Sequence, residues 1–103
     1  MNILTGIVIN LNPKRLLCDV ETDDGRRLQD VVILKPGGSK STGISTFPKI
    51  GERHILFLDQ RFNRAYLGPP CDNEIIDIKE EVGEGECLIF ADDGSLIKVY
   101  KQG

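Results

Sequence analysis

The stretch KPGGSKSTG at residues 35–43 holds the residue types most suggestive of a chemical site, because glycines, a lysine and hydroxyl groups together can cradle a phosphate. A loop of that kind needs the spacing G-x-x-x-x-G-K-[ST], followed by a helix whose N-terminus faces the phosphate. When the motif is aligned on Lys40 and Ser41, its two glycine positions hold Leu34 and Ser39. The next residues, GISTFPKIGE, contain a proline and a further glycine and are not expected to form that helix. The sequence therefore predicts a hydrophilic connection between strands at this place.

The residues that could act as a general base or a nucleophile are few and isolated. His54 is the single histidine, and it stands in a strand-like run with no second histidine or cysteine beside it. Ser41, Ser45 and Thr46 have no neighbouring base in the sequence that would activate a hydroxyl group. We therefore predict no catalytic residue and no enzymatic activity.

Metal and cofactor ligands are not expected either. The cysteines Cys18, Cys71 and Cys87 show no zinc-site spacing, and Cys18 alternates with apolar neighbours as a core residue would. The acidic stretch DNEIIDIKEEVGEGE at residues 72–86 lacks the D-x-D-x-D-G spacing of a calcium loop. It is more typical of a solvated acidic connector, so we predict no metal, no cofactor and no small-molecule substrate.

Composition and charge indicate a small cytoplasmic product with two parts. The 103 residues are 40% hydrophobic and 28% charged, and no apolar run approaches the ~18 residues of a membrane span. The cysteine pattern and the lack of a secretory signal favour synthesis in a reducing cytoplasm without disulfides. Residues 1–70 hold ten basic against seven acidic side chains, whereas residues 71–103 hold three against nine. A boundary is therefore expected near Gly68-Pro69-Pro70, where the prolines should also interrupt strand pairing.

A period of two in the apolar residues predicts β-strands throughout the first part of the chain. Gly6 inside the first run suggests a bulge or bend, and Asp23-Asp24-Gly25 has the chemistry of a tight hairpin turn. We therefore predict an all-β fold, with a small five-stranded OB-like barrel over residues 1–68 and an acidic linker over residues 69–84. The expected barrel strands cover residues 3–10, 15–22, 27–34, 52–59 and 64–67.

The C-terminal residues 85–103 are expected to form a separate β-hairpin. Two β-rich runs, residues 86–91 and 95–100, are joined by Asp92-Asp93-Gly94, in which Asp93 and Gly94 make a second tight turn. Such a hairpin is barely stable alone, and its apolar residues lie on both faces, so we expect it to bury them against other chains. The candidate oligomer-interface residues are Leu88, Phe90, Leu96 and Val99.

Several short motifs along the chain carry a resemblance to a known family. GIVINLNP at residues 6–13 matches a G-x-V-x-x-x-x-P opening, and FPKIGE at residues 47–52 matches a P-x-[VI]-G-[ED] step. FNRAYLG at residues 62–68 matches an Asn-Arg turn before a strand ending in Leu-Gly, and GECLIFADDGS at residues 85–95 matches a G-E-x-x-x-x-x-x-D-G-S pattern. The chain thus resembles the N-terminal OB-fold module of contractile-tail baseplate and spike proteins, namely phage baseplate assembly protein V, tail-spike hub proteins and the related secretion-system spikes.

This resemblance implies a structural, non-enzymatic virion protein of a phage tail baseplate or hub. It further implies a homotrimer, because the last matched pattern leads in that family into a trimeric β-structure. The implied partners are copies of the same chain and the proteins of the tail hub, baseplate or tail tube. The implied location is the tail of the virion, after synthesis in the host cytoplasm.

Two other classes of function are compatible with the residues. A small barrel with a basic face can bind single-stranded nucleic acid, here through Arg61, Phe62, Arg64 and Tyr66. Most aromatic residues of the barrel are, however, expected in its core, and the acidic C-terminal part opposes phosphate contacts, so nucleic acid is a disfavoured partner. An OB-type adaptor of a cellular complex would have much the same sequence features, because a fold does not define a function.

Two further expectations concern the backbone. In the PKIGE step, Gly51 is expected to be a structural turn residue with positive φ. Residues 36–46 are expected to form a mobile loop that the fold does not require.

Overall fold

The computed structural model describes residues 2–35, 38–39, 41–42, 44–71 and 81–99. Within these residues it contains seven β-strands and no helix, so the predicted all-β class is confirmed. Nothing in the described part of the chain is a helix long and apolar enough to span a membrane. The chain divides into two compact units, residues 1–73 and residues 74–103. Residues 72–80 of the predicted acidic linker lie outside the described residues.

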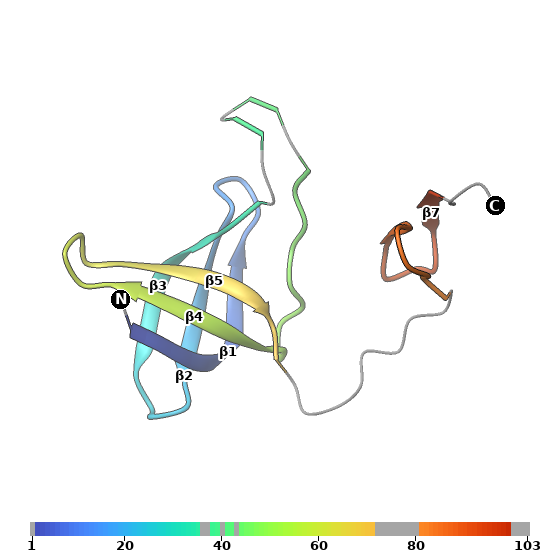
Figure 1. Ribbon diagram of the computed structural model, residues 1–103. Coiled ribbons are helices and arrows are strands. Elements are labelled where there is room, and N and C mark those ends of the chain that lie inside the picture. Colours follow the sequence, from blue (N-terminus) through green and yellow to red (C-terminus); the bar gives the residue numbers. More distant parts are fainter. Residues whose placement is uncertain (1, 36–37, 40, 43, 72–80, 100–103) are drawn as a thin grey trace. The chain divides into compact units, whose positions relative to one another are not determined.

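The first unit is a closed five-stranded barrel (Figure 1). Around the barrel the strands follow the order β1-β2-β3-β5-β4, and β4 pairs with β1 to complete the circle. All neighbouring strands are antiparallel except β3 and β5, which run parallel. The small barrel that the period of two predicted is therefore confirmed. The strands are β1 (Asn2–Asn12), β2 (Leu17–Thr22), β3 (Arg27–Ile33), β4 (Arg53–Asp59) and β5 (Arg64–Pro70).

The core of the barrel is aliphatic, and its residues alternate along the strands with residues that face outward. Cys18 is 2% exposed and belongs to this core, as predicted. Its burial, with a smaller contribution from the Asp19 carboxylate, raises the pKa of the Cys18 thiol to about 11, so the thiol stays protonated and unreactive. The buried core residues are Val8, Cys18, Val20, Val31, Ile33, Leu56 and Leu67.

The aromatic side chains of the barrel lie outside this core, which corrects the expectation that most of them fill it. Leu56 pairs with Leu67 across β4 and β5, and both side chains are buried in the interior. Their strand neighbours Phe57 and Tyr66 form the next pair and therefore point to the outer surface, where both are half-buried. The remaining phenylalanines of this unit are exposed. A core of aliphatic side chains and one cysteine, without a phenylalanine or tyrosine, is therefore sufficient to fill so small a barrel.

The last barrel strand is longer than predicted. β5 continues through Pro69 and Pro70, two residues beyond the expected end of the barrel at residue 68. Pro70 lies opposite His54 of β4, and the amide of Cys71 donates to the carbonyl of Arg53 at 3.0 Å. On its other side β5 pairs with β3 at only two residue pairs, and both precede the prolines. Among the described residues, Pro69 and Pro70 therefore have no strand on that side to which an amide would have to donate. The prolines therefore sit at a free edge and do not interrupt the pairing with β4.

Gly51 lies in a β-bulge immediately before β4. Its amide donates to the carbonyl of Val8 at 2.8 Å, and the amide of Val8 donates to the carbonyl of Glu52 at 3.0 Å. Gly51 and Glu52 therefore both lie opposite Val8, as in a G1 bulge, whose first residue is a glycine in the left-handed region. The φ of Gly51 is 96°, which is the positive value expected from the sequence. The Glu52 carboxylate accepts a hydrogen bond from the amide of Lys49 at 2.8 Å and holds the preceding turn.

Replacing Gly51 with valine is expected to lower the free energy of unfolding by about 1–3 kcal/mol, because a β-branched side chain is strained at positive φ. A Cβ at this position would meet no other part of the chain within 4 Å, so crowding adds nothing to the effect. Gly51→Asn is the matched control, because asparagine tolerates this conformation and should cost less. Urea denaturation of the three proteins measures the difference. Equal losses for valine and asparagine would contradict the explanation by backbone strain.

The loop between β3 and β4 is held by its own hydrogen bonds where it is described. The Lys35 ammonium donates to the carbonyl of Thr42 at 2.7 Å and to the carbonyl of Ser39. The amide of Ser39 also donates to the carbonyl of Thr42, at 2.8 Å. These bonds join loop residues to one another and to Lys35, the second residue after β3. The expected mobility falls partly on residues 36–37, 40 and 43, which lie outside the described residues, and it stays a prediction.

Replacing residues 36–46 with a short Gly-Ser link is expected to leave the thermal midpoint nearly unchanged, because the entropy of loop closure changes slowly with loop length. Circular dichroism during heating compares the shortened protein with the original. A loss of the cooperative transition in the shortened protein would show that the loop contributes to the fold.

Candidate assembly interface

The second unit contains a two-stranded antiparallel hairpin. Its strands are β6 (Cys87–Phe90) and β7 (Leu96–Val99), so the predicted C-terminal hairpin is present. With four residues in each strand, the hairpin has no second layer within the described residues of this unit, and a two-stranded ribbon is marginally stable in water. What covers its side chains is therefore the main functional question about this unit.

The connection between the two strands, residues 91–95, contains an Asp-Asp-Gly turn. The amide of Ala91 donates to the carbonyl of Ser95 at 2.8 Å, and the amide of Gly94 donates to the carbonyl of Ala91 at 3.0 Å. Gly94 has a φ of 93°, which a glycine adopts without steric cost. The carboxylate of Asp93 accepts a hydrogen bond from the amide of Ser95 at 2.9 Å, and this bond lowers the pKa of Asp93. The turn residues expected from the sequence thus set the hairpin register.

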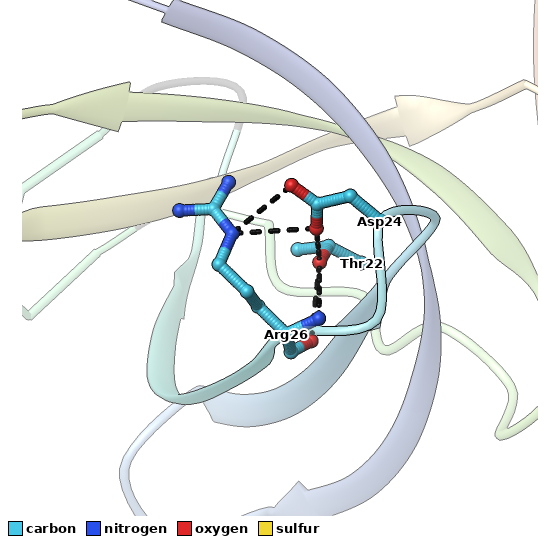
Figure 2. A network of polar contacts seen from close by, with 3 residues as sticks. All are labelled: Thr22, Asp24 and Arg26. Atoms are coloured by element: carbon cyan, nitrogen blue, oxygen red, sulfur yellow. Dashed lines mark hydrogen bonds and ion pairs between the residues drawn. The ribbon is translucent and has the colours of Figure 1, made fainter.

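The same Asp-Asp-Gly loop connects β2 to β3 in the barrel (Figure 2). There the hydroxyl of Thr22 donates to the Asp24 carboxylate, and the amide of Arg26 donates to the Thr22 hydroxyl oxygen at 2.9 Å. The Arg26 Nε lies 3.3 and 3.1 Å from the two carboxylate oxygens of Asp24. The hydrogen bonds from Thr22 and Arg26 lower the pKa of Asp24. Because both units use this turn, it is specified locally and does not depend on its surroundings.

The register of the hairpin assigns its side chains to two faces. Directly paired residues share a face, and successive pairs alternate between the faces. Every residue of the first face is exposed, with 65% exposure for Ile97 and 59% for Val99. We call this first face the apolar face, and it consists of Cys87, Ile89, Ile97 and Val99. We call the other the mixed face, and it consists of Leu88, Phe90, Leu96 and Lys98.

The four predicted interface residues do not form one surface. Leu88, Phe90 and Leu96 lie on the mixed face, whereas Val99 lies on the apolar face. Sequence reasoning did not single out Ile89 and Ile97, which pair with each other on the apolar face. Counting residue pairs outward from the Asp-Asp-Gly turn would have found them, because that turn sets which residues are opposite each other.

The two faces differ in polarity. On the mixed face, the Lys98 ammonium donates to the carbonyl of Glu81 at 2.6 Å, so this face carries a charge and meets a segment of its own unit. The apolar face carries no charged side chain and no side chain with a strong hydrogen-bonding group. It is therefore the surface of the hairpin whose contact with water is least favourable.

The single histidine is a buried structural residue of the barrel. The side chain of His54 is 7% exposed, and its Nδ1 lies 2.9 Å from the carbonyl oxygen of Gly68. Its Nε2 lies 3.3 Å from a carboxylate oxygen of Glu52. The ring thus ties β4 to β5 beside the bulge of Gly51. No group of three or more histidine, cysteine, aspartate or glutamate side chains among the described residues could hold a metal ion.

The residues proposed for nucleic-acid binding are placed on the outside of the barrel. Arg64 and Tyr66 alternate with inward residues and share the outer face of β5. In the turn before β5, the guanidinium of Arg61 lies 5.3 Å from the centre of the Phe62 ring and also contacts Asp59, 3.3 Å from Nε to the carboxylate. These hydrogen bonds from Arg61 lower the pKa of Asp59. The guanidinium of Arg61 is therefore already engaged in contacts within the turn.

The outer face of β2 and β3, which binds oligonucleotides in many OB-folds, is acidic in this barrel. Asp19, Glu21 and Asp30 lie along these two strands, and Arg27 is 3.6 Å from Asp19. A surface with more carboxylates than cations repels a phosphate backbone. Nucleic-acid binding at this face is therefore disfavoured.

Comparison with known proteins does not place the chain in a family. No protein-family model matches it, and no curated protein sequence matches it. What the protein does must therefore be inferred from its own residues and their geometry.

Proposed function

We propose that the protein is a non-enzymatic structural subunit that assembles as a homotrimer through its C-terminal hairpin. The apolar face carries this proposal, because a short hairpin leaves two isoleucines, a valine and a cysteine exposed together. Burial of an aliphatic side chain of this size contributes about 1.5–3 kcal/mol. Every copy gains that contribution when its apolar face meets other copies, so the unit becomes stable through assembly.

A closed ring of copies suits this hairpin better than open association. The outer edges of β6 and β7 have no ladder partner among the described residues, and such edges promote uncontrolled pairing. Cyclic symmetry gives each edge and each apolar face a neighbour and leaves none free. The number three comes from the resemblance to tail-spike proteins, in which the corresponding segment leads into a trimeric β-structure.

The resemblance also supplies the biological setting of the proposal, a phage tail baseplate or hub with tail proteins as neighbours. Support comes from the positions of the short matched motifs in the barrel. The glycine of the PKIGE step is Gly51 of the bulge, and Asn63 of the Asn-Arg turn has a φ of 49°. The glycine of the Leu-Gly ending is Gly68, where a Cβ would lie 2.7 Å from a Phe57 ring atom. These three motif residues thus occur at positions of positive φ or of close packing, as motif residues that specify a fold do.

Deleting residues 85–103 is expected to give a folded, monomeric barrel, whereas the full chain sediments as a trimer. The reason is that the core of the barrel lies within residues 1–73 and does not use the hairpin. Analytical ultracentrifugation at several concentrations measures both masses. A full chain that remains monomeric at high micromolar concentration would contradict the proposal.

Two substitutions in β7 distinguish the faces. Ile97→Lys places a charge on the apolar face and is expected to dissociate the trimer, because a buried unpaired charge is strongly unfavourable. Leu96→Lys is the matched control, since it adds the same charge next to it on the mixed face. Dissociation by Leu96→Lys alone would show that the mixed face is the interface.

Binding of single-stranded nucleic acid is the second candidate function, and one observation favours it. Phe57 and Tyr66 lie outside the core, where aromatic rings can stack on bases. The acidic outer face of β2 and β3 opposes it. A labelled oligonucleotide at low salt decides between the two candidates. If the chain is a monomer that binds the oligonucleotide tightly, and if Tyr66→Ala abolishes this binding, the second function is favoured. If the chain is a monomer that does not bind the oligonucleotide, an adaptor role is favoured.

A further inference from the structure

The barrel is closed between β3 and β5 along only part of these two strands, and we call the remaining, unpaired part the seam. These two parallel strands pair only at Val32 with Tyr66 and at Ile33 with Leu67. Toward the start of both strands no pair is formed across the seam among the described residues. Main-chain groups of β3 and β5 therefore face each other there without a ladder between them.

A β-bulge in β3 is the physical cause of this opening. Cys18 pairs with Val31 and Val20 pairs with Leu28, so two residues of β3 oppose Asp19 alone. One of them, Asp30, has a φ of 56°, and its amide donates to the Asp19 carboxylate at 3.2 Å instead of to a strand. A bulge bends its strand and disrupts its ladder, and this bulge at residues 29 and 30 lies just before Val32, the first residue of β3 that pairs with β5.

The opening forms a cleft of about 360 Å³ with an apolar floor. Leu28, Leu58 and Ala65 make up this floor, and all three are half-buried. The volume is at the lower end of the range of ligand pockets in proteins, about 300–1,000 Å³. The cleft is therefore large enough for a short stretch of another molecule.

The rim of the cleft carries carboxamides and one uncompensated charge. Gln29, Gln60 and Asn63 supply groups that can both donate and accept hydrogen bonds. Of the charged residues that line the cleft, Arg26 is bound to Asp24, and Asp59 is bound to Arg61. The remaining one, Arg64, makes no ion pair or side-chain hydrogen bond with any residue that the structure describes.

We propose that this seam is a binding site for an extended peptide segment that carries an acidic side chain. Unpaired strand edges bind a peptide main chain by adding a strand, and carboxamides at the rim can satisfy its remaining groups. The guanidinium of Arg64 pairs with the carboxylate of the peptide's acidic side chain. One free cation matches a single carboxylate, whereas a nucleic acid would bring several phosphates next to Asp19 and Asp30 of the same bulge. This site is independent of the hairpin and adds a second contact surface to the assembly proposed above.

Two-dimensional NMR of the full chain tests the site with a short synthetic peptide of alternating valine and glutamate. We expect the peptide to shift the amide signals of residues 27–30 and 64–65 in a saturable manner. A peptide with lysine in place of glutamate should bind at least tenfold more weakly, and N-methylation of the main chain of the acidic peptide should abolish binding. These peptide controls leave the protein unchanged, so they do not depend on the folding of a variant.

Arg64→Ala is expected to weaken binding of the acidic peptide by about tenfold or more, because a charge-assisted hydrogen bond is lost. Arg15→Ala, an exposed arginine in the loop between β1 and β2, is the matched control and should have no effect. The proposal is wrong if the lysine peptide binds equally well, if the acidic peptide shifts no signals at millimolar concentration, or if an oligothymidine binds at these residues and the acidic peptide does not.

Discussion

Replacing Gly6 with valine is expected to destabilise the barrel by about 3 kcal/mol or more, because the added side chain has no space between β1 and β2. A Cβ at this position would lie 2.6 Å from Cγ1 of Val20 and 2.8 Å from the carbonyl oxygen of Glu21. The oxygen belongs to the backbone of the paired strand, so the two strands must move apart to accept the new atom. Guanidinium chloride denaturation measures the loss as a shift of the midpoint at constant slope.

The substitutions Gly6→Ala and Gly68→Ala form a matched pair, and their losses of stability can be compared directly. At Gly68 a Cβ would lie 2.7 Å from a ring atom of Phe57 and 3.0 Å from the carbonyl oxygen of Ile55. The ring lies half-buried on the outer surface and can rotate away, so Gly68→Ala should cost less than Gly6→Ala. Equal losses at the two positions would show that contact with the neighbouring backbone does not determine the effect.

The reason why position 6 requires a glycine is not the bulge or bend that the sequence suggested. Gly6 pairs in register with Thr22 of β2 and with His54 of β4. The register shift of β1 lies between Val8 and Asn10 instead. The glycine is thus explained by the close approach of two strands, which depends on a partner far away in the sequence.

Leu56→Ala is the second substitution with a large expected effect, a loss of about 2–5 kcal/mol through the cavity it leaves. Leu56 is fully buried and pairs with Leu4 on one side and Leu67 on the other. A domain of this size has a total stability of about 5–15 kcal/mol, so the variant loses a large fraction of it. Thermal and urea denaturation of the barrel unit both report this change.

Ile3→Ala is the control for Leu56→Ala, because it removes a side chain of equal size from the outer surface. Ile3 is 67% exposed and pairs with Phe57, the outward neighbour of Leu56. We expect a change within about 0.5 kcal/mol for this exposed position. If Leu56→Ala costs less than about 1 kcal/mol, or no more than Ile3→Ala, the aliphatic interior is not the main source of stability.

Local chemistry was sufficient to locate the described strands and the tight turns, although β1 and β5 extend beyond their predicted ends. Both Asp-Asp-Gly loops and the positive φ of Gly51 follow from a few adjacent residues, and the structure contains them in two independent units. Strand positions follow from β-branched runs between those turns. The hairpin itself, and the exposure of apolar residues on both of its faces, were predictable for the same reason.

Which face of β4 is buried was decided only by the tertiary structure, whereas the alternation of Cys18 with Asp19 already indicated the inner face of β2. β4 contains the run Ile55–Leu58, in which every residue is apolar, so alternation gave no indication of the inner face. Pairing of Leu56 with Leu67, across a turn and in register, sends both leucines inward and the two aromatic residues outward. The same ambiguity divided the predicted interface residues between the two faces of the hairpin. Barrel closure also determines three further features: the close approach at Gly6, the contact of His54 with the Gly68 carbonyl, and the seam between β3 and β5. These features depend on residues far apart in the sequence, and a linear pattern contains no information about such contacts.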